Sequence, residues 1–234
     1  MKNKMILILL SIMIIIGLTA CNSSKEESND AERFKKEYES FNGNKNDYFE
    51  YRTLSINEKN HFIYSTAEDI VKMIENKETF IVYFGDPECP WCRSVIEQAT
   101  EAAIESNIEK IYYVRIWNGF HNEILRDVYE LKDGKLTIKS KGTEAYYRLL
   151  EYFDKILEDY TLTDENKNTI KVNEKRIFAP NFIFVKNGQA TELVQEISKK
   201  QESYNSYLSE EIKNEEKEIF ANFYSKTNSC TDKC

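Results

Sequence analysis

The pattern of apolar and polar positions divides the chain into three parts. A nearly unbroken apolar run extends from Met5 to Gly17, interrupted only by Ser11. Residues 22–47 are mostly polar and charged, and from residue 48 onward apolar positions recur at the spacing of helices and strands. The pattern predicts a short hydrophobic leader, a polar linking segment and one folded domain with its own core.

The first half of the folded domain is predicted to alternate strands and helices. The expected elements are strands at 48–56 and 61–64, a helix with Ser65 or Thr66 as its N-cap, a strand at 79–84, a helix ending near residue 105, and a strand at 110–117. The strand at 79–84 is apolar at nearly every position. Continuous apolar strands are typical of parallel or mixed sheets covered by helices on both faces.

The second half of the domain is less regular. The expected elements are a helix at 122–131, a polar, turn-rich stretch at 134–141, an amphipathic helix at 143–159, a hairpin of 160–163 with 169–172, a strand at 182–185 that turns through 186–189 into a partner at 190–195, and a closing helix at 203–224. No internal repeat or second Pro/Gly linker is present, so we expect one domain at 48–226, followed by a tail at 227–234.

Two cysteines lie where the strand at 79–84 passes into the next helix. The sequence there is Cys89-Pro90-Trp91-Cys92. A C-x-x-C in this context is typical of a redox pair, because the free N–H groups at a helix N-terminus favour a thiolate. Cys89 is therefore the expected nucleophile, and Cys92, one turn on, is the expected resolving thiol. Pro90 suits the first helical position, where no N–H is needed.

Acidic residues next to this pair oppose the effect of the helix. If the carboxylates of Asp86 and Glu88 lie close to the thiols, they raise the thiol pKa. The sequence leaves open which effect is larger.

The N-terminus has the pattern of a secretory signal peptide over residues 1–20, with Lys2 and Lys4 before the apolar run. It ends in Leu18-Thr19-Ala20-Cys21, which resembles the lipobox of bacterial lipoproteins. The resemblance implies cleavage before Cys21, a diacylglycerol on its sulfur and acyl chains such as palmitate that anchor the protein in a membrane. The alternative is an ordinary cleaved signal peptide in which Cys21 carries no lipid.

Residues 21–47 are expected to form a solvated tether between the anchor and the domain. Phe34, Tyr38 and Phe41 recur at helical spacing, so a short amphipathic helix within this segment is an alternative.

Composition excludes some functions and leaves others open. The formal charge is −8 and no basic stripe is present, so we expect no nucleic-acid partner. Of the five cysteines, Cys230 and Cys234 have three interpretations: a second disulfide, a pair that exchanges with Cys89 and Cys92, or free thiols. Their spacing does not match a zinc ribbon or finger, so we expect no metal and no cofactor beyond the redox-active disulfide.

Residues 61–224 resemble the thioredoxin fold in three connected places. These are the stretch 83–92 around the cysteine pair, Pro180 just before the strand at 182–185, and Asn187-Gly188 in the turn that follows. The resemblance implies a three-layer α/β thioredoxin-like fold, with a helical insertion at about 118–176 before the cis-proline strand. It also implies that a cis Pro180 supports the active site, together with Pro90 and Trp91.

The chain departs from the thioredoxin pattern at one position. Thioredoxins commonly carry a buried carboxylate six residues before the first cysteine, and here that residue is Tyr83. The Pro-Trp dipeptide between the cysteines matches neither the reductive nor the strongly oxidising members, so oxidase, reductase and isomerase all stay open. Overall, the sequence is similar to thioredoxin-like extracytoplasmic lipoproteins of Gram-positive bacteria, near their bacteriocin-accessory branch.

Two functional hypotheses follow. The first is a thiol–disulfide oxidoreductase, lipid-anchored on the outer face of the plasma membrane, that acts on thiols or disulfides of exported proteins or peptides and is served by a separate redox partner protein. The second is a non-catalytic accessory lipoprotein that binds an exported partner through residues 118–176.

Overall fold

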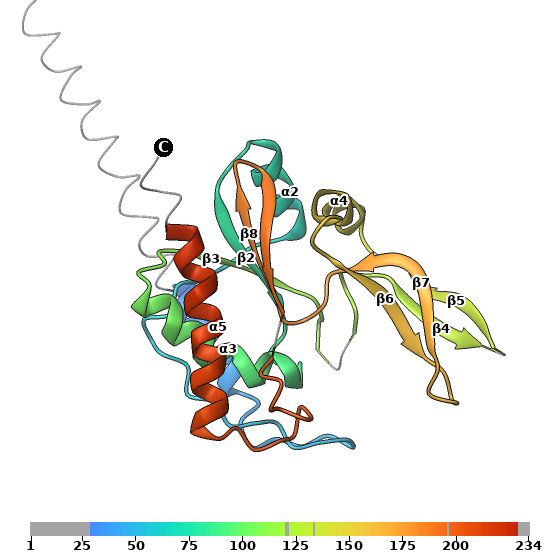
Figure 1. Ribbon diagram of the computed structural model, residues 1–234, viewed down its shortest axis with the longest axis horizontal. Helices are drawn as coiled ribbons and strands as arrows, with labels where there is room; N and C mark the ends of the chain where they lie inside the picture. The colour runs from blue at the N-terminus through green and yellow to red at the C-terminus, as the bar shows by residue number, and fades with distance from the viewer. Residues whose placement is uncertain (1–28, 120–121, 133, 196, 229–234) are drawn as a thin grey trace, which may run out of the picture.

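A computed structural model describes residues 29–119, 122–132, 134–195 and 197–228. The predicted leader, the anchor Cys21, and Cys230 and Cys234 lie outside the described residues. The chain forms an α/β fold around a mixed five-stranded sheet (Figure 1). Within the described ranges, no helix combines the length and the apolar character needed to cross a bilayer.

The central sheet has the strand order β1-β3-β2-β8-β9. Its strands are β1 (Phe62–Tyr64), β2 (Phe80–Gly85), β3 (Ile111–Arg115), β8 (Asn181–Lys186) and β9 (Gln189–Val194). Strands β1, β3 and β2 are parallel, whereas β8 runs antiparallel to both β2 and β9. All six residues of β2 are buried, as its continuous apolar sequence predicts.

Helices cover both faces of this sheet. Helices α3 (Pro90–Glu105) and α5 (Glu210–Asn228) pack together on one face, and α2 (Ala67–Glu75) and α4 (Glu144–Phe153) pack on the other (Figure 1). Thr66 caps α2 and Thr143 caps α4, each accepting a backbone N–H three residues on. The core therefore consists of two apolar clusters separated by the sheet.

The N-terminal segment belongs to the folded domain. Residues 29–39 form a helix, and its Phe34 and Tyr38 side chains are fully buried. The Phe34 ring stacks on that of Phe62 in β1, with centroids 4.0 Å apart. The expected solvated tether is thus wrong for residues 29–39, where the alternative of a short amphipathic helix is confirmed.

The predicted strand at 48–56 is also wrong. These residues have no regular structure beyond a bridge at Glu50, and the Tyr48 side chain is 84% exposed. Their aromatic content contributes to loop packing, since Phe49 and Tyr51 are in edge-to-face contact at 4.9 Å.

The insertion is mainly β-structure, which corrects the expected helical insertion. It contains one hairpin of β4 (Val128–Lys132) with β5 (Lys135–Ser140), then α4, then a second hairpin of β6 (Glu158–Thr163) with β7 (Thr169–Arg176). The second hairpin was predicted, but the helix at 122–131 and the turn-rich stretch at 134–141 were not correct. Both hairpins project away from the central sheet (Figure 1), so few of their side chains are buried and their apolar periodicity is weak.

Two predicted helices have different limits in the structure. The amphipathic helix expected at 143–159 ends at Phe153, because Glu158 already begins β6. The closing helix begins at Glu210 instead of residue 203 and continues through Asn228, so it also includes the first two residues of the predicted tail.

A buried ion network holds the base of the insertion. Arg126 pairs with Glu123 through Nη2 at 2.7 Å and donates from Nη1 to the carbonyl of Ile177 at 3.0 Å. Arg176 donates to the carbonyl of Asp127 at 2.6 Å, and its guanidinium lies 4.1 Å from the Tyr160 ring centroid. These contacts tie the insertion to the segment just before Pro180.

Candidate functional site

The cysteine pair lies at the first turn of α3. Cys89 is the N-cap residue of this helix, and its sulfur accepts the backbone N–H of Cys92 at 3.3 Å. Pro90 begins the helix, where its missing N–H costs no hydrogen bond. Both cysteines carry free thiols and are buried, with Cys89 4% and Cys92 0% exposed. The structure therefore brings the two predicted redox residues together on one helical turn.

The segment around Pro180 lies against this pair. The Ala179–Pro180 peptide bond is cis, which confirms the expected isomer. The Cys89 thiol donates to the Ala179 carbonyl at an Sγ–O distance of 3.5 Å. Trp91 is half-buried, and its ring meets the Tyr204 ring edge-to-face, with centroids 5.9 Å apart. Cys89, the more exposed of the two cysteines, thus lies beside the loop that contains the cis proline.

The Asp86 carboxylate is directed toward a cation. Asp86 is fully buried, and its oxygens accept from Arg115 Nε at 2.8 Å and from the Glu88 backbone N–H at 2.9 Å. Burial raises the pKa of Asp86, and the hydrogen bond from Arg115 opposes that shift. Arg115 also lies 3.8 Å from Glu88 and 3.7 Å from Glu37. The acidic turn before the pair is therefore partly neutralised by Arg115.

The Cys92 thiol has a largely apolar environment. Burial raises the pKa of Cys92 well above its ordinary value, and the neighbouring Cys89 thiol raises it further. The Tyr83 hydroxyl and the backbone N–H of Asp86 lower the Cys92 pKa, because donors near the sulfur favour the thiolate. Asp86 thus presents its backbone to Cys92, and its carboxylate to Arg115.

Tyr83 occupies the position where the family resemblance leads one to expect a carboxylate. It is fully buried on β2, and its ring stacks with Phe182 at 4.3 Å and with Tyr113 at 5.4 Å. Its hydroxyl lies 2.7 Å from the Tyr38 hydroxyl. A Cβ at Gly85 would lie 2.1 Å from the Tyr83 hydroxyl oxygen, so this site requires glycine.

The sequence interpretation missed Arg93, the residue that follows Cys92. Its side chain is fully buried and donates to the carbonyls of Tyr38 at 2.7 Å and Pro87 at 3.1 Å, and to that of Arg52. Burial lowers the pKa of Arg93 to about 10, so the guanidinium stays charged at neutral pH. Arg93 thereby fastens the N-terminal segment to the first turn of α3. An arginine beside a C-x-x-C, at a helical position that faces the core, is the signal that could have revealed it.

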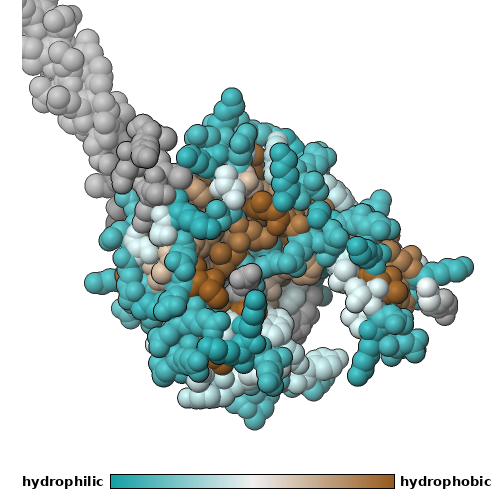
Figure 2. Space-filling view, in the orientation of Figure 1, coloured by the Kyte–Doolittle hydropathy of each residue, from teal (hydrophilic) through white to brown (hydrophobic). Residues whose placement is uncertain are grey.

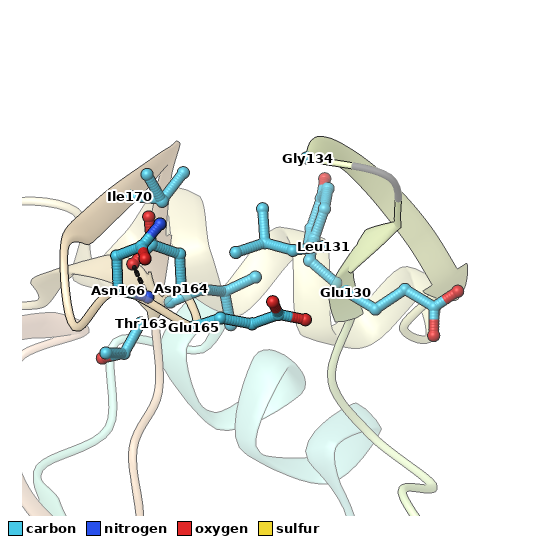
Figure 3. A pocket seen from close by; sticks show the side chains of 10 residues that line it. Glu130, Leu131, Gly134, Thr163, Asp164, Glu165, Asn166 and Ile170 are labelled. Carbon is cyan, nitrogen blue, oxygen red and sulfur yellow. Dashed lines mark hydrogen bonds between the residues drawn. The ribbon is translucent and has the colours of Figure 1, made fainter.

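A second concave region lies between the tips of the two hairpins, and it contains neither cysteine (Figure 3). Its volume is about 600 Å³. Leu131, Leu162 and Ile170 supply apolar side chains, and Glu130 and Glu165 supply carboxylates. The same part of the molecule shows apolar surface among hydrophilic surroundings (Figure 2). The mixture of apolar and acidic side chains suits the binding of a partner molecule, but the lining contains no thiol for redox chemistry.

Within the ranges that the structure describes, no group of three or more His, Cys, Asp or Glu side chains is arranged to hold a metal ion. Comparison with protein-family models and with curated protein sequences finds no match for the chain. The fold and the site thus define an α/β protein with a mixed central sheet and a close C-x-x-C pair at a helix N-terminus, an arrangement suited to thiol–disulfide chemistry.

Proposed function

We propose that the protein is a thiol–disulfide oxidoreductase that uses Cys89 as nucleophile and Cys92 as resolving thiol. The observation that carries the proposal is the placement of the Cys89 sulfur at the N-cap of α3, where it accepts the Cys92 N–H and lies beside Ala179. Unpaired N–H groups and the helix dipole favour a negative sulfur at this position. The strand order of the central sheet and the cis Pro180 support a thioredoxin-like arrangement.

In the reducing direction, the reaction has two exchange steps. The Cys89 thiolate attacks a substrate disulfide, forms a mixed disulfide and releases one substrate thiolate. Cys92 then loses its proton and attacks the Cys89 sulfur, which forms the Cys89–Cys92 disulfide and releases the second substrate thiolate. Two electrons pass from the pair to the substrate. Oxidation of a substrate dithiol is the reverse sequence.

The proposed location and substrates rest on the N-terminal sequence. A lipid on Cys21 would hold the domain at the outer face of the plasma membrane, where exported proteins or peptides are the available thiols and disulfides. A redox partner protein would then be needed to restore the pair after each turnover.

Exchange with a small aromatic disulfide tests the proposed activity. The wild-type protein should release the aromatic thiol and end with an oxidised pair. Cys89→Ser should abolish this release, whereas Cys92→Ser should stop at a mixed disulfide visible by mass spectrometry. If Cys89→Ser reacts as fast as the wild type, the proposal is wrong. Equilibration of the pair against glutathione then gives the reduction potential, and hence the favoured direction.

The cleft between the hairpins favours a second candidate function. An accessory protein that binds an exported partner would use residues 118–176, and the apolar side chains of Leu131 and Leu162 give such a partner a place to bind. In that case Leu131→Ser with Leu162→Ser should abolish biological activity while thiol exchange is unchanged, and Cys89→Ser should leave biological activity intact.

A further inference from the structure

A line of hydroxyl groups leads from the N-terminal helix to the resolving cysteine. Tyr38 lies on the helix at 29–39, Tyr83 lies on the central strand β2, and Cys92 lies in the first turn of α3. All three side chains are 0% exposed. The hydroxyl oxygens of Tyr38 and Tyr83 are 2.7 Å apart, and both tyrosines lie with Cys92 in one buried cluster, where the Tyr83 hydroxyl lowers the Cys92 pKa.

The surrounding packing fixes Tyr83 in this position. Its ring is held between Phe182 on one neighbouring strand and Tyr113 on the other, at 4.3 and 5.4 Å between centroids. The side chain extends across Gly85, where any Cβ would collide with it. Tyr38 is held in turn by the Phe34 ring at 4.6 Å and by the bond from Arg93 to its carbonyl.

The direction of the hydrogen bonds follows from the number of protons. Each phenol has one O–H to donate, and a thiolate can only accept. In a hydrogen bond between Tyr83 and the Cys92 thiolate, Tyr83 must therefore be the donor, and the Tyr83 oxygen is then free to accept the Tyr38 O–H. Burial raises the pKa of Tyr83 and of Tyr38 well above that of an ordinary phenol, so both stay neutral and act as donors, not as bases.

We infer that Tyr38 and Tyr83 form a hydrogen-bond donor chain that stabilises the Cys92 thiolate while it resolves the mixed disulfide, so that the N-terminal helix is part of the redox site. The inference rests on the proposed function and names the groups that serve its second step. A charge-assisted hydrogen bond in a dry site is stronger than a neutral one, and a second phenol behind the first polarises it further.

The step balances without any further reagent. The Cys92 proton passes to the substrate thiolate released in the first exchange, and Tyr83 keeps its own proton throughout. The Cys92 thiolate then forms the bond to Cys89 as the Cys89–substrate bond breaks. The other groups that face Cys92 or Tyr83 are the Cys89 sulfur, the backbone N–H of Asp86 and the Tyr113 ring. Arg115 holds the Asp86 carboxylate at 2.8 Å.

Removal of single hydroxyl groups tests the inference. In Tyr83→Phe, resolution of a pre-formed mixed disulfide should slow by roughly 10- to 100-fold, because a hydrogen bond to a charged sulfur is lost. Tyr38→Phe should slow the same step by a few-fold. In both variants, alkylation of Cys89 should proceed at the wild-type rate, since the hydrogen bonds of the Cys89 sulfur go to the Ala179 carbonyl and the Cys92 N–H.

Tyr113→Phe is the matched control. Tyr113 is also fully buried and stacks on Tyr83, but its hydroxyl makes no hydrogen bond, so its loss should leave the resolution rate unchanged. As a second measurement, the Cys92 pKa can be titrated by thiolate absorbance in a Cys89→Ser background, where Tyr83→Phe should raise it.

The outcomes separate the inference from the proposed function. If the wild-type protein exchanges no disulfide, the proposed function fails. If it does, and Tyr83→Phe resolves the mixed disulfide as fast as Tyr113→Phe with an unchanged Cys92 pKa, the donor chain is wrong. Equal slowing in all three variants would show a packing effect and would also overturn it.

Discussion

The two faces of the central sheet both bury polar side chains, but they satisfy them differently. Beside α4, the buried charges of Glu123, Arg126, Asp127 and Arg176 all have partners within the insertion or the segment before Pro180. On the face of α3 and α5, several buried polar atoms of the described residues have no hydrogen bond: Arg52 Nε, Glu88 Oε1, Gln98 Oε1, Tyr113 Oη, Gln201 Oε1, both Glu216 oxygens and Tyr224 Oη.

The difference indicates that the face beside α4 has a structural role, whereas the face of α3 and α5 carries the candidate chemistry. An ion network whose members are all paired is what a fold needs to hold an insertion in place. Polar groups without partners cost stability, and they lie on the side of the sheet that also carries the cysteine pair, which indicates a face whose composition serves more than packing. The cysteines, the three buried tyrosines Tyr38, Tyr83 and Tyr113, and the buried Arg93 all lie on this second face.

The largest expected effect on stability comes from breaking the ion pair between Arg126 and Glu123 on the face beside α4. Arg126→Leu leaves the Glu123 carboxylate buried without its bidentate partner, and it removes the bond to Ile177. We expect a loss of about 3–5 kcal/mol in the free energy of unfolding, measured by urea denaturation. The matched control is Lys72→Ala, which removes the exposed pair with Asp69 and should cost under about 0.5 kcal/mol. Similar losses in both variants would contradict the proposed role of the network.

The next largest effect is a pH dependence of stability that arises from Glu216 on α5, whose carboxylate oxygens have no hydrogen bond. Its side chain is fully buried, and burial raises its pKa to about 7, an effect that the positive charge of Arg52 opposes. The folded state therefore holds a proton that the unfolded chain releases near pH 4.5. Stability should fall as pH rises from about 4.5 to 7, by roughly 3 kcal/mol in total.

Glu216→Gln tests this pH dependence, because the amide has no charge to bury. The variant should lose most of the slope between pH 4.5 and 7 and should be more stable than the wild type at pH 7.5. The opposite sign, a wild-type protein that gains stability over this range while the variant does not, would show that the Glu216 carboxylate is paired in solution.

The smallest effect compares two tyrosine hydroxyls on opposite sides. Tyr113→Phe removes a buried hydroxyl without a partner and should be neutral or stabilising by up to about 1 kcal/mol. Tyr147→Phe removes a hydroxyl that donates to Asp127 at 2.7 Å and should cost about 1 kcal/mol. Thermal unfolding of the two variants measures the difference, and equal melting temperatures would remove the contrast between the two faces.

The sequence by itself determined the centre of the molecule. The apolar strand β2, the turn, the cysteine pair and α3 follow one another within residues 80–105, so spacing and composition suffice to predict them. The strand β8 and its turn into β9 are equally local. Strong periodicity over buried elements makes such predictions reliable, because every position along them is constrained by the core.

Only the tertiary structure decided what surrounds this centre. Residues 29–47 have the composition of a linker, and Phe34 and Tyr38 become core residues because Phe62 and Tyr113, distant in sequence, form the surface that receives them. Arg93 is buried because its acceptors are backbone carbonyls brought together by the fold. The projecting hairpins bury too little surface to leave a clear pattern. The spacing of apolar residues predicts burial only where an element packs against a regular helix or sheet surface. The contacts of Phe34, Tyr38 and Arg93 instead join segments that are distant in sequence, and only folding brings them together.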